Sequence, residues 1–191
     1  MEADSQAEHR GVVCDTLRRL ASELDRIQIP YAVVGGIALQ HFGIQRSTQS
    51  VDLLVTPSHL REIHDKLIGH GYALKGQGSR HLRDEISRVR IEFLVSGEYP
   101  GDGKPKSVQF PNPEAVSQIS DDGIRFVNLE KLIELKLASA KSAAHRIKDQ
   151  ADVLELIHFL SLPAAFAERL DPYVQTEFRE LAALPPPSER D

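Results

Sequence analysis

The sequence predicts an α/β (α+β) fold in which short strands alternate with amphipathic helices. Two segments, 51–55 and 89–95, alternate apolar and polar residues as half-buried strands do. Apolar residues recur at helical spacing in 9–27, in 57–68 and again after Leu129. A chain of 191 residues that is 41% hydrophobic is long enough to bury a core.

The segment 31–55 contains most of the unusual chemistry. Tyr31 to Val34 is a short apolar run, and Gly35-Gly36 then precedes a helical segment, 37–42. Glycines at such a turn bring backbone N–H groups to the start of a helix, where phosphate binds. The alternative is an ordinary tight turn between a strand and a helix.

The loop before the second strand carries Arg46 and Thr48. A guanidinium and a hydroxyl at this place either reach phosphate oxygens or fix the loop. In the strand that follows, Asp52 lies beside Ser50 on the face opposite to Val51, Leu53 and Val55.

A second carboxylate, Glu92, lies in the middle of the strand 89–95. It either pairs with Arg90 or another cation, or joins Asp52 on a neighbouring strand to form a metal-binding set. Oxygen donors of this kind suit Mg²⁺.

Later in the chain, Lys136 falls on the apolar face of a helix that begins near Leu129. Its ammonium either extends to water or serves a ligand. Asp149 and Asp152 share a helical face in the next segment, where Lys148 and Asp152 have the spacing of a surface ion pair.

These motifs, in this order, resemble the nucleotidyltransferase (DNA polymerase beta-like) superfamily, and in particular its small AbiEii-like, toxin-related members. The similarity runs from Tyr31 to Ile157, through Gly-Gly-x-Ala-Leu, Arg46-x-Thr48, Val-Asp-Leu-Leu-Val, and LIELKLAS followed by RIKDQADV. It implies a short mixed sheet flanked by helices, with a C-terminal helical portion that closes one side of the cleft.

The resemblance also implies roles for these residues. Asp52 and Glu92 would hold the Mg²⁺ of a nucleoside triphosphate. The nucleotide-binding residues would be Gly35, Gly36, Arg46, Thr48, Lys136 and Asp149. Asp149, with Asp152 as the second choice, would match the late aspartate motif and have a secondary positioning role. Ser50 stands where the family has the first aspartate of its D-x-D motif. A neutral hydroxyl is a poor replacement for a bridging carboxylate, so we expect weakened metal binding.

Composition limits the location and the partners. The formal net charge of −5 argues against broad electrostatic attraction to nucleic acid. The single cysteine suits a reducing cytosol, no Cys/His spacing is typical of structural zinc, and no apolar run reaches the length of a membrane span. We therefore expect a cytoplasmic protein without a membrane partner.

The sequence further suggests a nucleotidyltransferase-like core over 1–128, a helical portion of the same compact unit over 129–182, and a disordered tail over 183–191. Three interpretations of function remain. The protein transfers a nucleotide to a hydroxyl of RNA or protein, in full or weakened form. Alternatively it is a non-catalytic nucleotide- or partner-binding module of a toxin–antitoxin-type system with an antitoxin partner. Otherwise it is an unrelated α/β domain in which the two carboxylates lie apart and are salt-bridged.

Overall fold

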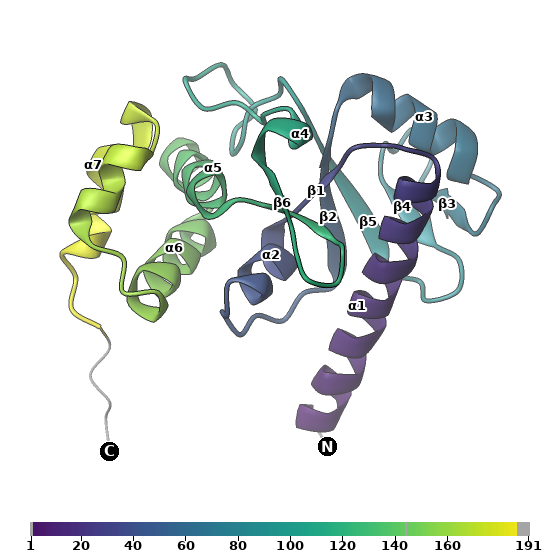
Figure 1. Cartoon of the computed structure of the whole chain (residues 1–191), viewed down its shortest axis with the longest axis horizontal. Coiled ribbons are helices and arrows are strands. Elements are labelled where there is room, and N and C mark those ends of the chain that lie inside the picture. The colour runs from purple at the N-terminus through teal and green to yellow at the C-terminus, as the bar shows by residue number, and fades with distance from the viewer. Residues whose placement is uncertain (1, 144, 187–191) are drawn as a thin grey trace.

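The structure, a computed structural model, describes residues 2–143 and 145–186. Within these residues a seven-stranded mixed sheet has the order β3-β4-β5-β2-β1-β7-β6 (Figure 1). The strands are β1 (Ala32–Val34), β2 (Ser50–Val55), β3 (Tyr72–Leu74), β4 (Leu82–Asp84), β5 (Arg90–Val95), β6 (Ser117–Ile119) and β7 (Arg125–Val127).

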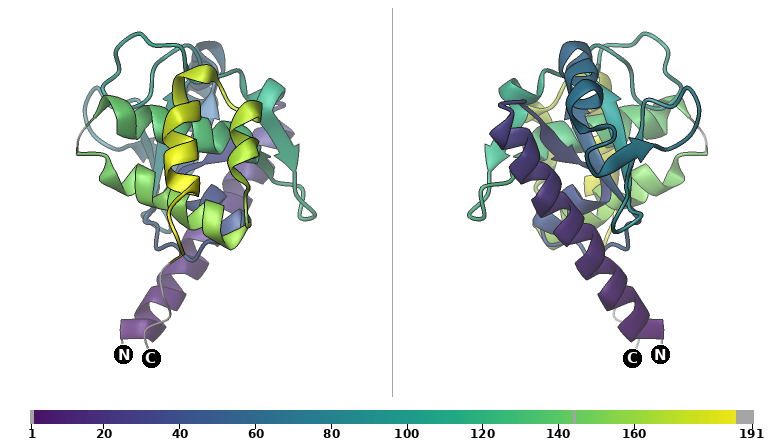
Figure 2. Two further views of the ribbon diagram at one scale, coloured as in Figure 1. Left: turned by 90° about the vertical axis from the view of Figure 1, so that its left-hand side faces the viewer. Right: turned by 90° about the vertical axis from the view of Figure 1, so that its right-hand side faces the viewer.

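Helices cover both faces of the sheet. They are α1 (Glu2–Arg26), α2 (Gly35–His41), α3 (Pro57–Leu67), α4 (Pro113–Val116), α5 (Leu129–Ser142), α6 (Ile147–Phe159), α7 (Gln175–Ala182), and the 3-10 helices η1 (Ala164–Arg169) and η2 (Pro172–Val174). Figure 2 shows α5 to α7 nearest the viewer on one side and α1 with α3 on the opposite side. The sheet therefore lies between two helical layers.

Strand pairing at the centre of the sheet determines where the polar residues lie. β2 runs parallel to β5 and antiparallel to β1, and β1 runs parallel to β7. Asp52 of β2 is in register with Glu92 of β5. Because side chains in register on adjacent strands project to the same face, these two carboxylates lie side by side.

The local sequence explains where the main helices begin. Thr56 caps α3 by accepting a hydrogen bond from the backbone N–H of His59 at 3.2 Å, and Pro57 supplies the preset φ of the first turn. Asn128 caps α5 in the same way through the N–H of Lys131 at 2.9 Å. The apolar faces of α1 and α3 then pack on the sheet through residues such as Leu20 and Ile63, which are fully buried.

The predicted mixed sheet flanked by helices is confirmed. The short strands β4, β6 and β7 and the one-turn helix α4 are additional to the predicted elements, since three or four residues carry too little periodicity to be recognised. Residues 187–191 of the predicted tail lie outside the described residues. The boundary near residue 128 stays a prediction. No described helix is both long enough and apolar enough to cross a membrane.

Candidate functional site

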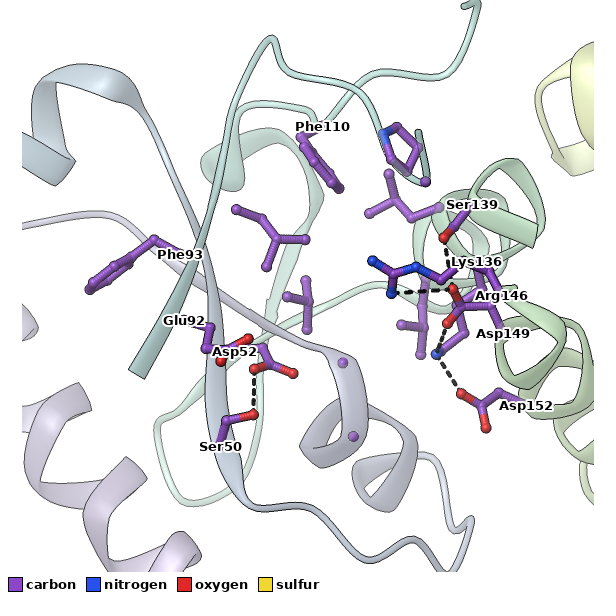
Figure 3. A pocket seen from close by; sticks show the side chains of 18 of the residues that line it. Ser50, Asp52, Glu92, Phe93, Phe110, Lys136, Ser139, Arg146, Asp149 and Asp152 are labelled. Atoms are coloured by element: carbon purple, nitrogen blue, oxygen red, sulfur yellow. Dashed lines mark hydrogen bonds and ion pairs between the residues drawn. The ribbon is translucent and has the colours of Figure 1, made fainter. Parts of the chain in front are cut away.

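A cleft of about 1220 Å³ opens between the sheet and the helices α5 and α6. Asp52 and Glu92 line its sheet side, and Lys136 with Asp149 lines its helical side (Figure 3). The two carboxylates are neighbours in register, so they do not lie far apart as the unrelated-domain interpretation expected. Among the described residues, no three His, Cys, Asp or Glu side chains converge as a metal site.

Ser50 and Asp52 form one polar unit on β2. The Ser50 hydroxyl donates to Oδ1 of Asp52 at 2.8 Å, and both side chains face the cleft. Ser50 is therefore placed where an aspartate would add a carboxylate next to Asp52. The hydroxyl instead satisfies one oxygen of the carboxylate that is present.

Burial raises the pKa of the Asp52 carboxyl above its ordinary value, because desolvation disfavours the charged form. The hydrogen bond from Ser50 and the charge of Lys136 oppose this shift, whereas the negative charge of Glu92 adds to it. The site thus holds two carboxylates in a setting that penalises their combined charge.

Glu92 already has cationic neighbours on the sheet. Its Oε1 accepts from Nζ of Lys75 at 3.0 Å and lies 3.9 Å from the Arg90 guanidinium. The predicted pairing with a cation is therefore present, and it coexists with the juxtaposition to Asp52. Glu92 and Lys75 are each about one third exposed, so water screens this pair and its contribution to stability is small.

Gly35 makes the closest approach between the turn and the carboxylates. Its φ is +66°, and a Cβ added there would lie 2.1 Å from Oδ2 of Asp52. A Cβ on Gly36 would lie 2.9 Å from Cβ of Thr48. The glycine pair is required because the backbone contacts Asp52 and the loop directly.

We expect Gly35→Ala to displace the Asp52 carboxylate and to destabilise the protein by about 1–3 kcal/mol through backbone strain and the new close contact. Urea denaturation would measure the loss. Gly69→Ala is the matched control, since Gly69 also has a positive φ but its added Cβ would meet nothing within 4 Å. An equal loss in both variants would mean that strain alone, and not the contact with Asp52, makes Gly35 necessary.

Arg46 and Thr48 fix the loop between α2 and β2. The Arg46 guanidinium donates to Asp152 of α6, and the Gln40 side chain donates to the Arg46 carbonyl. The Thr48 hydroxyl donates to the carbonyl of Ser50 at 3.2 Å. Of the two predicted alternatives for this pair, the structure contains the loop-fixing contacts.

The helical side of the cleft is a charged cluster. Nζ of Lys136 donates to Oδ1 of Asp149 at 3.1 Å and to Oδ2 of Asp152 at 2.6 Å. Ser139 donates to Oδ2 of Asp149 at 2.7 Å, and Arg146 lies 3.9 Å from the same oxygen. Figure 3 shows these side chains facing the carboxylates of the sheet across the cleft.

The contacts of this cluster show that two of the interpretations offered by the sequence are wrong, one for Lys136 and one for Asp152. Lys136 does not extend to water, because its side chain is 10% exposed and is bound by two carboxylates. Asp152 is not part of a surface pair with Lys148, because its side chain is only 3% exposed and is bound by Lys136 and Arg46. Buried carboxylates persist when they are paired and hydrogen-bonded, which is the arrangement here.

All the residues proposed from the sequence line this one cleft: Gly35, Gly36, Arg46, Thr48, Ser50, Asp52, Glu92, Lys136 and Asp149. Their roles stay a prediction. The sequence did not indicate Ser139 or His81, which also line the cleft. His81 accepts from the backbone N–H of Phe93 through Nδ1 at 3.0 Å. A single serine or histidine in an otherwise ordinary segment carries no spacing signal.

The raised pKa of Asp52 implies a pH-dependent cost to stability. A carboxyl whose pKa rises on folding stabilises the fold while protonated, and this contribution is lost as the pH rises through the folded pKa. We therefore expect Asp52→Asn to resist urea better than the wild type at pH 7 without Mg²⁺. The difference should shrink as the pH falls toward the ordinary pKa of aspartate.

Asp102→Asn is the control with the opposite sign. Hydrogen bonds from Lys106 and from the Lys104 backbone N–H hold the pKa of Asp102 below its ordinary value. Its ionised form therefore favours the fold, and its removal should not stabilise the protein at pH 7. A wild type as stable as Asp52→Asn at every pH would contradict the expected cost at Asp52.

The comparisons with known proteins concern the fold. The sequence matches no protein-family model and no curated protein. The structure is similar to an antigenic nucleotidyltransferase-like protein from Paracoccidioides brasiliensis, with a TM-score of 0.53 and 16% identity over 87% of this chain and 85% of that chain. It is also similar to ANT(2")-Ia in complex with adenylyl-2"-tobramycin, with a TM-score of 0.55 and 14% identity over 91% and 99% of the two chains. The chain therefore has a nucleotidyltransferase-like fold.

Proposed function

We propose that the cleft binds a magnesium nucleoside triphosphate and that the protein transfers the nucleotide to a hydroxyl of RNA or protein. The observation that carries this proposal is the pair Asp52 and Glu92, in register on parallel strands and facing Lys136 across the cleft. The nucleotidyltransferase-like fold of the two solved structures supports it. Membership of the AbiEii-like group is part of the proposal and rests on the sequence motifs alone.

The residues of the sheet fit a magnesium ion. Mg²⁺ prefers oxygen ligands and is commonly held by one or two carboxylates together with substrate phosphates. Asp52 and Glu92 supply these oxygens, and the raised pKa of Asp52 marks a negative charge that a cation would stabilise. Bound there, Mg²⁺ would neutralise charge on the phosphates as pyrophosphate leaves.

The other residues would bind and orient the triphosphate. The ammonium of Lys136 would contact phosphate oxygens, and the backbone N–H groups of Gly35-Gly36, next to Asp52, would donate to the same phosphates. Arg46 and Thr48 would act by holding the loop before β2 in place. In the reaction, the acceptor hydroxyl oxygen attacks the α-phosphorus and its proton passes to solvent. The bond from the α-phosphorus to the oxygen bridging to the β-phosphate breaks, and pyrophosphate departs.

Ser50 affects how much nucleotidyl transfer the protein retains, because it stands where a metal-binding aspartate is expected. With serine at this position, the proposed metal site has two carboxylates, and Glu92 is already paired with Lys75. These two observations favour the alternative function, in which the protein binds a nucleotide or a partner without turnover in a toxin–antitoxin-type system. The proposed location is the cytoplasm, which the single cysteine of the chain suits.

The test is transfer of label from each of four α-labelled nucleoside triphosphates to total RNA and to total protein in the presence of Mg²⁺. The wild type and Asp52→Ala are compared, with Asp65→Ala as a control for an exposed aspartate outside the cleft. We expect one nucleotide to be transferred by the wild type and by the control, and not by Asp52→Ala. Transfer that survives in Asp52→Ala would disprove the proposed site.

A further inference from the structure

The two aspartates that bind Lys136 differ in how firmly the fold holds them. Asp152 has a side chain that is 3% exposed, and each of its oxygens is bound by a different cation, Arg46 and Lys136. Asp149 is 17% exposed, and its contact to Lys136 is longer, at 3.1 Å against 2.6 Å. The more exposed carboxylate is thus also the one more loosely bound by the lysine.

The charges of this cluster are balanced without a ligand. Two cations, Arg46 and Lys136, face two carboxylates, and Arg146 lies at the edge with half of its side chain exposed. An ammonium has three N–H donors, of which Asp149 and Asp152 take two. The third donor can reach one phosphate oxygen, but a phosphate that takes a second hydrogen bond from Lys136 must displace one of the two carboxylates.

We propose that Asp149 is a displaceable counter-ion for Lys136, exchanged for a polyphosphate when ligand enters, whereas Asp152 is a positioning residue that holds Lys136 throughout. This inference rests on the proposed function, because it takes the ligand to be a triphosphate. It assigns opposite effects on ligand binding to two aspartates that lie three residues apart on α6.

Asp149 can release the lysine at low cost. After Lys136 turns to a phosphate, the Asp149 carboxylate keeps the hydrogen bond from Ser139 at 2.7 Å and the nearby charge of Arg146. It also retains access to water. A partly exposed carboxylate with a remaining donor carries little of the penalty that an unpaired buried charge would carry.

Asp152 cannot be exchanged in the same way. Its burial leaves no water to replace a lost cation, and its second oxygen ties α6 to Arg46 in the loop that leads to Ser50 and Asp52. Asp152 therefore keeps the lysine of α5 in a fixed relation to the carboxylates of the sheet. Removing its charge would leave both Arg46 and Lys136 without their buried partner.

Binding of inorganic triphosphate and of the four nucleoside triphosphates, measured by titration calorimetry with Mg²⁺, tests this inference. Asp149→Asn removes a competing negative charge and should tighten binding about fivefold. Asp152→Asn should weaken binding at least about tenfold. Glu155→Gln is the matched control, because it removes the same charge from the same helix, 3.8 Å from Arg46, without contact to Lys136. We expect its affinity to stay within about twofold of the wild type.

Weaker binding in Asp149→Asn would overturn the inference, since it would make Asp149 a direct ligand or a structural residue. The direction of the affinity change in Asp149→Asn therefore tests the exchange even if Asp152→Asn does not fold. If the wild type binds a triphosphate and both variants weaken it equally, the proposed function stands and the exchange is disproved. If no triphosphate binds to any of the proteins, both the proposed function and the exchange at Lys136 are disproved. Tightening by Glu155→Gln equal to that by Asp149→Asn would also overturn the exchange, because it would indicate a general effect of charge.

Discussion

Ser50→Asp is expected to raise nucleotidyl transfer about 100-fold, the upper end of the range for residues that support a bound metal. The substitution places a third carboxylate beside Asp52, at the position from which Ser50 now donates its hydrogen bond. A carboxylate can ligate Mg²⁺ through a charged oxygen, whereas a serine hydroxyl offers only a neutral one. The rate of label transfer at saturating nucleotide measures the effect.

The same substitution should reduce stability in the absence of metal. Asp52 already carries the cost of desolvation and of the neighbouring charge of Glu92, and another negative charge adds repulsion. Mg²⁺ should therefore raise the melting temperature of Ser50→Asp more than that of the wild type. Ser50→Asn is the control, because asparagine has the shape of aspartate but is neutral. It should show neither the gain in transfer rate nor the larger rise in melting temperature with Mg²⁺. An equal rate in Ser50→Asp and the wild type would indicate that the site does not use a carboxylate at this position.

Lys136→Met is expected to destabilise the protein by about 3–5 kcal/mol, because it removes one partner of a buried ion pair. Asp152 and Asp149 would then share only Arg46, Ser139 and the more distant Arg146. Methionine fills a similar volume, so lost packing contributes little. Urea denaturation gives the free energy of unfolding of each variant.

A second substitution separates charge from packing in this cluster. Lys136→Met with Asp152→Asn removes one charge of each sign and should recover part of the lost stability. Lys141→Met is the matched control on the same helix, since Lys141 pairs with Glu177 and is 35% exposed. Its loss should stay below about 1 kcal/mol. No recovery in the double variant would show that the charge balance is not what stabilises this cluster.

Pattern alone identified the elements that carry a long periodic signal. The alternation around Asp52 and around Glu92 predicted the central strands β2 and β5, and the helical spacing of leucines predicted α1 and α3. The sequence could not show that these two strands pair in register, because parallel neighbours need not be adjacent in the chain. The resemblance to a known superfamily supplied that expectation.

The contacts of the helical side were not predictable in the same way. Arg46 and Asp152 are separated by 106 residues, and no local pattern indicates that they meet. The sequence instead offers Lys148 as a local partner for Asp152, at the spacing of a helical ion pair. That prediction was wrong, because Asp152 pairs with Lys136. Burial decided between the two, and burial of one face of α6 depends on how α5 and the loop before β2 pack against it.

Equilibrium binding of the four nucleoside triphosphates to the wild type and to Asp52→Ala, with and without Mg²⁺, tests the central claim most directly. The cleft is expected to bind at least one of them in a Mg²⁺-dependent manner, and Asp52→Ala is expected to lose that dependence while remaining folded. Absence of binding to the wild type, or binding that depends on Mg²⁺ equally in both proteins, would contradict a metal–nucleotide site at Asp52 and Glu92.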